Sequence, residues 1–169
     1  MDDILRQCIK QRKVYFDRIN IPPEYKFTWD YVIPIFDEQA RTGNKRAIDT
    51  RKMFFPLSVN DHPLISSITE KLSELSEREC NSCHVYAGLG TQTRASPVHK
   101  DRMHVFVVQV LGSCDWKVFE DGYDDIKKEG KATLSLRMIP GNCIYIPQGI
   151  YHAAFPDQSR MLLSFGFQD

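Results

Sequence analysis

The sequence predicts a mainly β protein of the α+β class, in which short strands form a β-sandwich or jelly-roll barrel that carries an N-terminal helical layer. Apolar residues recur at helical spacing in the first part of the chain, whereas short β runs bounded by turn residues dominate the second part. The hydrophobic share of 42% is enough for a buried core. We therefore expect one domain over residues 1–169, with the helical layer in 1–80 and a β-barrel that holds the functional site in 81–169.

Three segments of the first half have the apolar spacing of a helix. The first covers residues 4–16. The second begins after Thr28, a residue suited to an N-cap, although Pro34 inside it disfavours a regular helix. The third covers residues 63–75 and keeps one apolar stripe along its length. These segments form the predicted helical layer.

Short strands are expected from Cys83 onward. Each run is rich in β-branched and aromatic residues and is bounded by turn residues, as in sandwich and barrel domains. The runs are 84–86, 105–110, 116–119, 133–136, 143–146 and 161–165.

A C-x-x-C-H spacing over Cys80, Cys83 and His84 raises the question of a c-type haem. Haem attachment of this kind requires export, and the first residues show no apolar run of a signal peptide. A single C-x-x-C also gives only half of a four-ligand zinc site. We interpret both cysteines as small buried or half-buried residues at a helix-to-strand junction. Five cysteines at irregular spacing favour reduced thiols, and we expect a cytoplasmic protein.

Charge and hydropathy exclude some partners. The 22 basic and 22 acidic residues balance, so nucleic acid is not an expected partner. The basic cluster within residues 41–52 is interpreted as solvated helix and loop surface. No apolar run is long enough to cross a membrane. The expected substrate is a protein, a peptide or a small molecule, and the chain is expected to be a monomer or a homodimer.

Two short groups in the second half contain the residue types of a metal site. His99 and Asp101 are two residues apart, which places their side chains on one face of an extended strand. Residues 141–152 read G-x5-P-x-G-x2-H, a turn on Pro and Gly that delivers His152 at the start of the next strand. Two histidines and one carboxylate form the facial triad of non-haem Fe(II) oxygenases. His104 is expected to be packed or at the surface, because strand geometry points it away from the metal.

The stretch from Cys83 to Phe167 resembles the Jumonji-C and cupin-like branch of the Fe(II)/2-oxoglutarate-dependent oxygenases. The resemblance rests on the run His-Lys-Asp at 99–101, the apolar run 105–112 with Trp116 after it, and the group at 141–152, which is similar to the second cupin signature box. The chain departs from that box at Pro156, where cupins usually have asparagine.

The resemblance implies a double-stranded β-helix, or cupin jelly roll, that converts 2-oxoglutarate to succinate while O₂ oxidises the substrate. The family includes protein hydroxylases that act on ribosomal proteins and the asparaginyl hydroxylase of hypoxia signalling. By position, His99, Asp101 and His152 would hold Fe(II). Ser96 would help to hold a carboxylate of 2-oxoglutarate, and Tyr86 is the candidate for a tyrosine that similar proteins place on the same group.

One position departs from the family in a way that concerns the co-substrate. Fifteen residues after the first histidine, where the family has a lysine or arginine, this chain has Cys114, which cannot form a charge-assisted pair with a carboxylate. Lys117 falls on the opposite strand face by parity. Arg160 shares parity with Ser164, which aligns with a family position facing the co-substrate, and its guanidinium suits a carboxylate. The alternative is that Arg160 lies at the barrel rim and pairs with Asp157.

Three functions are compatible with these residues. The first is an Fe(II)/2-oxoglutarate-dependent oxygenase that acts as a hydroxylase, with Arg160 in place of the missing cation. The second is a metal-dependent cupin enzyme that does not use 2-oxoglutarate, which Cys114 favours. The third is a non-catalytic cupin binding protein, which three convergent ligands argue against.

Overall fold

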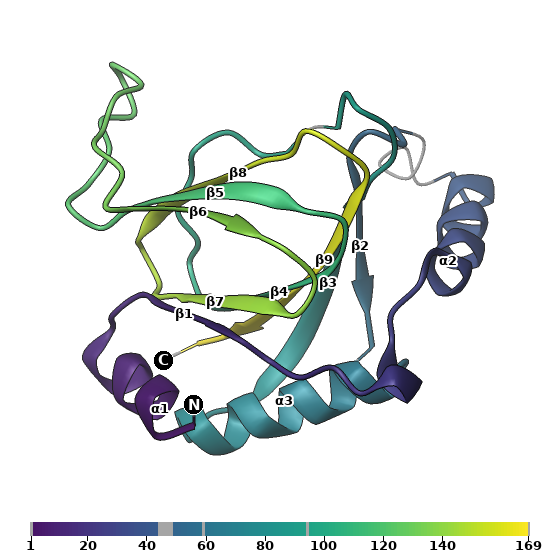
Figure 1. The fold of residues 1–169 in the computed structure, drawn as a ribbon, viewed down its shortest axis with the longest axis horizontal. Helices are drawn as coiled ribbons and strands as arrows, with labels where there is room; N and C mark the ends of the chain where they lie inside the picture. Colours follow the sequence, from purple (N-terminus) through teal and green to yellow (C-terminus); the bar gives the residue numbers. More distant parts are fainter. Residues whose placement is uncertain (1, 44–48, 59, 94, 169) are drawn as a thin grey trace.

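The computed structural model describes residues 2–43, 49–58, 60–93 and 95–168 (Figure 1). Its helices are α1 (Asp2–Gln11), α2 (Trp29–Arg41) and α3 (Pro63–Ser76), with a short 3₁₀ helix at Pro23–Tyr25. Its strands are β1 (Tyr15–Arg18), β2 (Met53–Leu57), β3 (Cys80–Gly88), β4 (His104–Leu111), β5 (Cys114–Phe119), β6 (Leu134–Met138), β7 (Asn142–Ile146), β8 (Tyr151–Phe155) and β9 (Arg160–Phe167).

Two antiparallel sheets face each other and form the predicted jelly roll. The larger sheet has the order β1-β7-β4-β9-β3-β2, and the smaller has the order β6-β5-β8 (Figure 1). Alternation along β4 divides its side chains between two cores. Val105 and Val107 enter the barrel interior, whereas Phe106 and Val108 join a cluster on the outer face of the larger sheet. The mainly β fold class predicted from the sequence is confirmed.

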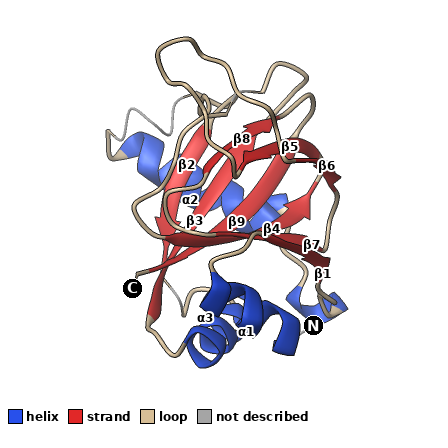
Figure 2. Ribbon diagram, turned by 90° about the vertical axis from the view of Figure 1, so that its left-hand side faces the viewer, coloured by secondary structure: helices blue, strands red, loops and turns tan. Residues whose placement is uncertain are grey.

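The helical layer covers that outer face (Figure 2). Leu5 of α1 and Leu72 of α3 are buried in one cluster with Phe106 and Phe165 of the sheet, and α2 contributes Val32. Burial of each large apolar side chain contributes about 2 kcal/mol, so the layer stabilises the sheet from behind. None of the described helices is long and apolar enough to span a bilayer.

Helices α2 and α3 lie where the apolar spacing of the sequence predicted them. The first helix is shorter than predicted. It ends at Gln11, Arg12 follows at φ +52°, and Tyr15–Arg18 forms β1, which pairs with β7. Tyr15 is buried whereas Phe16 is 41% exposed, which is the alternation of an edge strand. A pair of adjacent aromatic residues is compatible with the period of a helix and with that of a strand. Pairing with β7 in the sheet makes this segment a strand.

Cys80 and Cys83 lie on β3 and are buried free thiols. Burial raises the pKa of the Cys80 thiol to about 11 and also raises the pKa of Cys83, where Cys80 adds to the effect. Both side chains are therefore neutral at ordinary pH, and metal binding and redox chemistry both favour thiolates. The structure supports the interpretation of these two residues as part of the core.

A close contact between two turns sets the position of β9. Gly112, in the turn between β4 and β5, has φ +62°, and a Cβ atom there would lie 2.1 Å from the carbonyl oxygen of Ser159. The turn before Arg160 therefore packs directly on the backbone at Gly112. Only glycine permits this approach.

We expect Gly112→Ala to lower the free energy of unfolding by about 3 kcal/mol, because a methyl group overlaps the backbone and the left-handed conformation adds to the cost. Gly90 is the matched control, since it has φ +88° and a Cβ atom there would meet no atom within 4 Å. Gly90→Ala should cost about 1 kcal/mol through its backbone conformation alone. Urea unfolding of both variants measures the difference, and equal losses would mean that the contact with Ser159 is unimportant.

Candidate metal centre

Backbone hydrogen bonds bring the two histidines together. His99 lies in the connection between β3 and β4, and His152 is the second residue of β8. The amide of His99 donates to the carbonyl of His152 at 3.0 Å, and the amide of His152 donates to the carbonyl of His99 at 2.8 Å. The amide of Gly149 also donates to the carbonyl of Asp101 at 3.1 Å. The segment 99–101 is thus fixed against the start of β8.

The predicted strand at 99–101 is not present. His99 forms an isolated β-bridge with His152, and Asp101 lies in a loop. The expected convergence of the three side chains is nevertheless found, because one ligand atom of each lies within 4.8 Å of the others. The turn at 147–150 and the bridge therefore produce the geometry that strand alternation was expected to produce.

Each imidazole is oriented so that Nε2 faces the carboxylate. His99 Nδ1 lies 2.9 Å from the carbonyl of Pro97, and His152 Nδ1 lies 3.0 Å from the carbonyl of Ile150. A carbonyl only accepts hydrogen bonds, so each Nδ1 carries a proton, and in the neutral ring each Nε2 keeps a lone pair that can bind a metal. The Nε2 atoms of His99 and His152 lie 3.9 and 3.4 Å from carboxylate oxygens of Asp101.

The burial of the three side chains leaves one side of the centre open. The His152 side chain is 5% exposed, whereas those of His99 and Asp101 are 41% and 35% exposed. Burial acts to raise the pKa of Asp101, but the two histidines in their protonated forms, His152 first and then His99, lower it below its ordinary value. Asp101 is therefore an anionic ligand at neutral pH. Two neutral imidazoles and one carboxylate fit a divalent iron centre.

His104 takes no part in this group, as predicted. It is buried, its Nδ1 lies 2.8 Å from the hydroxyl of Tyr145, and its ring stacks on Phe167 at 5.2 Å between ring centroids.

The four predicted co-substrate residues line the same cavity as the triad. Tyr86 lies on β3, Arg160 and Ser164 lie on one face of β9, and Ser96 precedes His99 in the connecting loop. Burial raises the pKa of Tyr86 to about 12, and the charge of Asp101 adds to the shift. Its phenol is therefore a neutral hydrogen-bond donor at working pH. Apolar walls come from Val105, Val107 and Leu162.

Arg160 is a buried cation rather than a rim residue. It is 2% exposed, and its Nη1 donates to the carbonyl of Tyr86 at 3.2 Å. Burial lowers its pKa from the ordinary value, with the neighbouring Cys114 acting in the opposite sense. The Cys114 thiol, in turn, has its pKa raised by burial to about 11 although the charge of Arg160 lowers it. Arg160 thus lies beside the residue that replaces the family cation.

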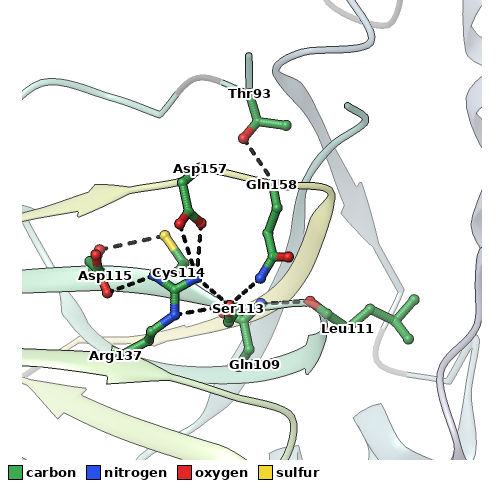
Figure 3. A network of polar contacts seen from close by, with 9 residues as sticks. All are labelled: Thr93, Gln109, Leu111, Ser113, Cys114, Asp115, Arg137, Asp157 and Gln158. Atoms are coloured by element: carbon green, nitrogen blue, oxygen red, sulfur yellow. Dashed lines mark hydrogen bonds and ion pairs between the residues drawn. The ribbon is translucent and has the colours of Figure 1, made fainter. Parts of the chain in front are cut away.

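Asp157, the alternative partner, pairs with Arg137 instead (Figure 3). Arg137 Nη2 lies 3.0 Å from both carboxylate oxygens of Asp157 and donates to Ser113 Oγ at 2.7 Å. Ser113 also accepts from Gln158 Nε2, and the Gln158 carbonyl accepts from Thr93 at 3.1 Å. This network ties the β8–β9 turn to the β4–β5 turn, to β6 and to the β3–β4 connection, and so it fixes the start of β9.

Lys52 is a cavity residue that sequence reasoning missed. It immediately precedes β2, lines the cavity, and its Nζ donates to Ser96 Oγ at 3.4 Å. The basic cluster to which it belongs was interpreted as solvated surface, and Lys45 and Arg46 of that cluster lie outside the described residues. No motif surrounds Lys52, and only the unpredicted pairing of β2 with β3 places it here.

A comparison of the sequence with known protein families identifies the domain. Residues 62–169 match the JmjC domain, which is more than half of the chain. The chain belongs to the JmjC domain family. The match extends further toward the N-terminus than the resemblance read from the sequence, because it includes α3. None of the curated proteins matches the chain.

Solved structures similar to this JmjC domain include oxygenases. The ribosomal oxygenase YcfD from Escherichia coli, in complex with cobalt and 2-oxoglutarate, has a TM-score of 0.67 at 15% identity over 98% of this chain and 51% of that chain. Its complex with cobalt and succinic acid aligns at 22% identity and a TM-score of 0.57, over 69% of this chain and 31% of that chain. The non-haem alpha-ketoglutarate-dependent carbocyclase SnoK, from nogalamycin biosynthesis, has a TM-score of 0.60 at 12% identity over 97% of this chain and 82% of that chain.

These similarities show a shared fold. The JmjC domain described here spans between 31% and 51% of the length of the YcfD chains that it matches.

We expect Asp101→Ala to abolish Fe(II) binding while the fold is retained, because the variant lacks the anionic ligand and leaves only two imidazoles. Asp30→Ala is the matched control, since Asp30 is exposed on α2. Anaerobic isothermal titration with Fe(II) measures affinity, and circular dichroism checks the fold of the JmjC domain. Unchanged iron affinity in Asp101→Ala would rule out the triad.

Proposed function

We propose that this JmjC domain is an Fe(II)/2-oxoglutarate-dependent oxygenase that acts as a hydroxylase. The observation that carries the proposal is the group of His99, Asp101 and His152, with both Nδ1 atoms bonded to carbonyls, in one cavity with the buried Arg160. Bound Fe(II) would supply open coordination positions for a 2-oxo acid and O₂. The similarity to structures described with cobalt and 2-oxoglutarate supports this reading.

The protein holds its three ligands without rearrangement. Each Nε2 already faces Asp101, since the opposite ring nitrogen is bonded to a carbonyl two residues earlier in the chain. Such bonds orient a metal ligand and increase its basicity. Val105, Val107 and Leu162 form apolar walls, which limit the access of water to the reacting groups.

Arg160 supports 2-oxoglutarate as the co-substrate. A buried guanidinium is costly unless it meets an anion, and its fork of donors matches a carboxylate. Tyr86 can donate a hydrogen bond in the same cavity. Among the described residues, the buried Trp116 Nε1 has no hydrogen-bond partner, although Trp116 lines the cavity. A bound ligand would satisfy that donor.

The substrate, the assembly and the compartment stay predictions. We propose a protein, a peptide or a small molecule as the substrate, a monomer or homodimer as the assembly, and the cytoplasm as the compartment. A metal-dependent cupin enzyme that does not use 2-oxoglutarate is the second candidate, because Cys114 leaves the family's usual cation position without a charge.

An anaerobic titration of the Fe(II)-loaded protein with 2-oxoglutarate separates the two candidates. Chelation of Fe(II) by the 2-oxo acid produces a visible charge-transfer band, and admission of O₂ should then release succinate. A band followed by succinate supports the oxygenase. Tight iron binding without a band would overturn the oxygenase and favour the second candidate.

We expect Arg160→Met to weaken 2-oxoglutarate binding by about 30-fold, because hydrogen bonds to charged groups contribute about 2 kcal/mol. Lys117→Met is the matched control, since Lys117 is exposed on the opposite face of β5 with its Nζ 5.3 Å from the centroid of the Phe155 ring. It should leave binding within about twofold of the parent protein, as is usual for surface changes. Titration of the visible band gives both affinities. Equal losses in the two variants would contradict the role of Arg160.

A further inference from the structure

We infer that Lys52 supplies a second cation for the far carboxylate of 2-oxoglutarate, opposite Arg160, and that the two form a clamp. The inference rests on the proposed function, since it names a further residue of the same co-substrate site. Lys52 lies ahead of residues 62–169, which match the JmjC domain. The clamp therefore draws one of its two cations from the N-terminal part of the chain.

Strand register places the two basic side chains on the same face of the sheet. Phe54 of β2 pairs with Tyr86 of β3, and Tyr86 pairs with Leu162 of β9. Side chains two residues apart in a strand share a face of the sheet. Lys52 therefore lies on the same face as Phe54, and Arg160 lies on the same face as Leu162. The central strand β3 lies between the two cations, with Gly88 as the partner of Arg160. Both cations line the cavity of the triad.

The contacts of Lys52 leave its charge available. Among the described residues, Lys52 contacts the hydroxyl of Ser96, whose Oγ accepts from Nζ at 3.4 Å. The nearby carboxylate of Asp49 is held by Arg51 through two hydrogen bonds of 2.9 and 3.1 Å. An ammonium group that lines a cavity and forms no ion pair with a neighbouring carboxylate favours the binding of an anionic ligand. Ser96 still has its own hydroxyl proton to donate to that ligand.

The two cations differ in burial, and this suggests different tasks. Arg160 is buried and fixed to the carbonyl of Tyr86, so it presents a rigid fork from the interior. Lys52 is half-buried and also lines an adjoining open pocket with Asp49 and Phe54. Its flexible stem can approach the carboxylate from the opening. A carboxylate held from both sides distinguishes a dicarboxylic 2-oxo acid from a monocarboxylic one.

The test compares two ligands that differ only in the far carboxylate. Anaerobic isothermal titration of the Fe(II)-loaded protein measures the affinity for 2-oxoglutarate and for 2-oxopentanoate, which has the same chain length with a methyl end. The variants are Lys52→Met, Lys52→Arg, which keeps the charge, and Lys117→Met as the control. The titration reports binding and does not require turnover.

We expect Lys52→Met to weaken 2-oxoglutarate binding by about tenfold, as for the loss of one hydrogen bond to a charged group, and to leave 2-oxopentanoate binding unchanged. Lys52→Arg should recover most of the loss, and Lys117→Met should bind both ligands as the parent protein does. A loss shared by both ligands, or no loss for either, would overturn the clamp while the proposed function stands. A parent protein that binds iron but not 2-oxoglutarate would overturn both.

Discussion

The reciprocal pair of backbone hydrogen bonds between His99 and His152 is the constraint on which the site depends. Each imidazole is oriented locally, by the carbonyl two residues before it, so the ring directions need no long-range contact. The relative position of the rings does need one, because a long stretch of chain separates them. Two such bonds contribute only about 2 kcal/mol together, but they set the distance between the Nε2 atoms and Asp101. These two hydrogen bonds therefore contribute mainly to the precise placement of the ligand atoms and only a little to the stability of the fold.

The parts of the site that were predictable from the sequence are those with local causes. The turn before His152 contains Gly149 at φ +83°, with the amide of Ile150 bonded to the carbonyl of Pro147, as the Pro and Gly spacing indicated. The β runs of the barrel and the helix at α3 follow from periodicity. The two edge strands β1 and β2 could not be predicted from periodicity, because both are short and Pro56 interrupts the strand pattern of β2. Their existence depends on the strands that they pair with, which lie far away in the sequence.

The pair of Cys114 and Arg160 illustrates why the co-substrate site was only partly predictable. Parity placed Arg160 on the interior face of β9, but parity does not show burial or the proximity of a residue on the opposing sheet. A thiol at position 114 is smaller than a lysine and neutral, so it leaves room for a guanidinium beside it. The exposed ion pairs around Arg137 are individually weak, yet several bonds converge on one turn and define where β9 begins.

The N-terminal half has two physical roles, and its helical pattern indicated only the first of them. Its helices cover the outer face of the larger sheet, whereas β2 extends the same sheet and carries Lys52 to the cavity. An edge strand is held by neighbours on one side only, so β2 depends on its pairing with β3. A ligand that contacts Lys52 binds more tightly to the state in which β2 is paired, because only that state places Lys52 at the cavity. Occupancy of the cavity and docking of this strand are then linked by mass action, and each stabilises the other.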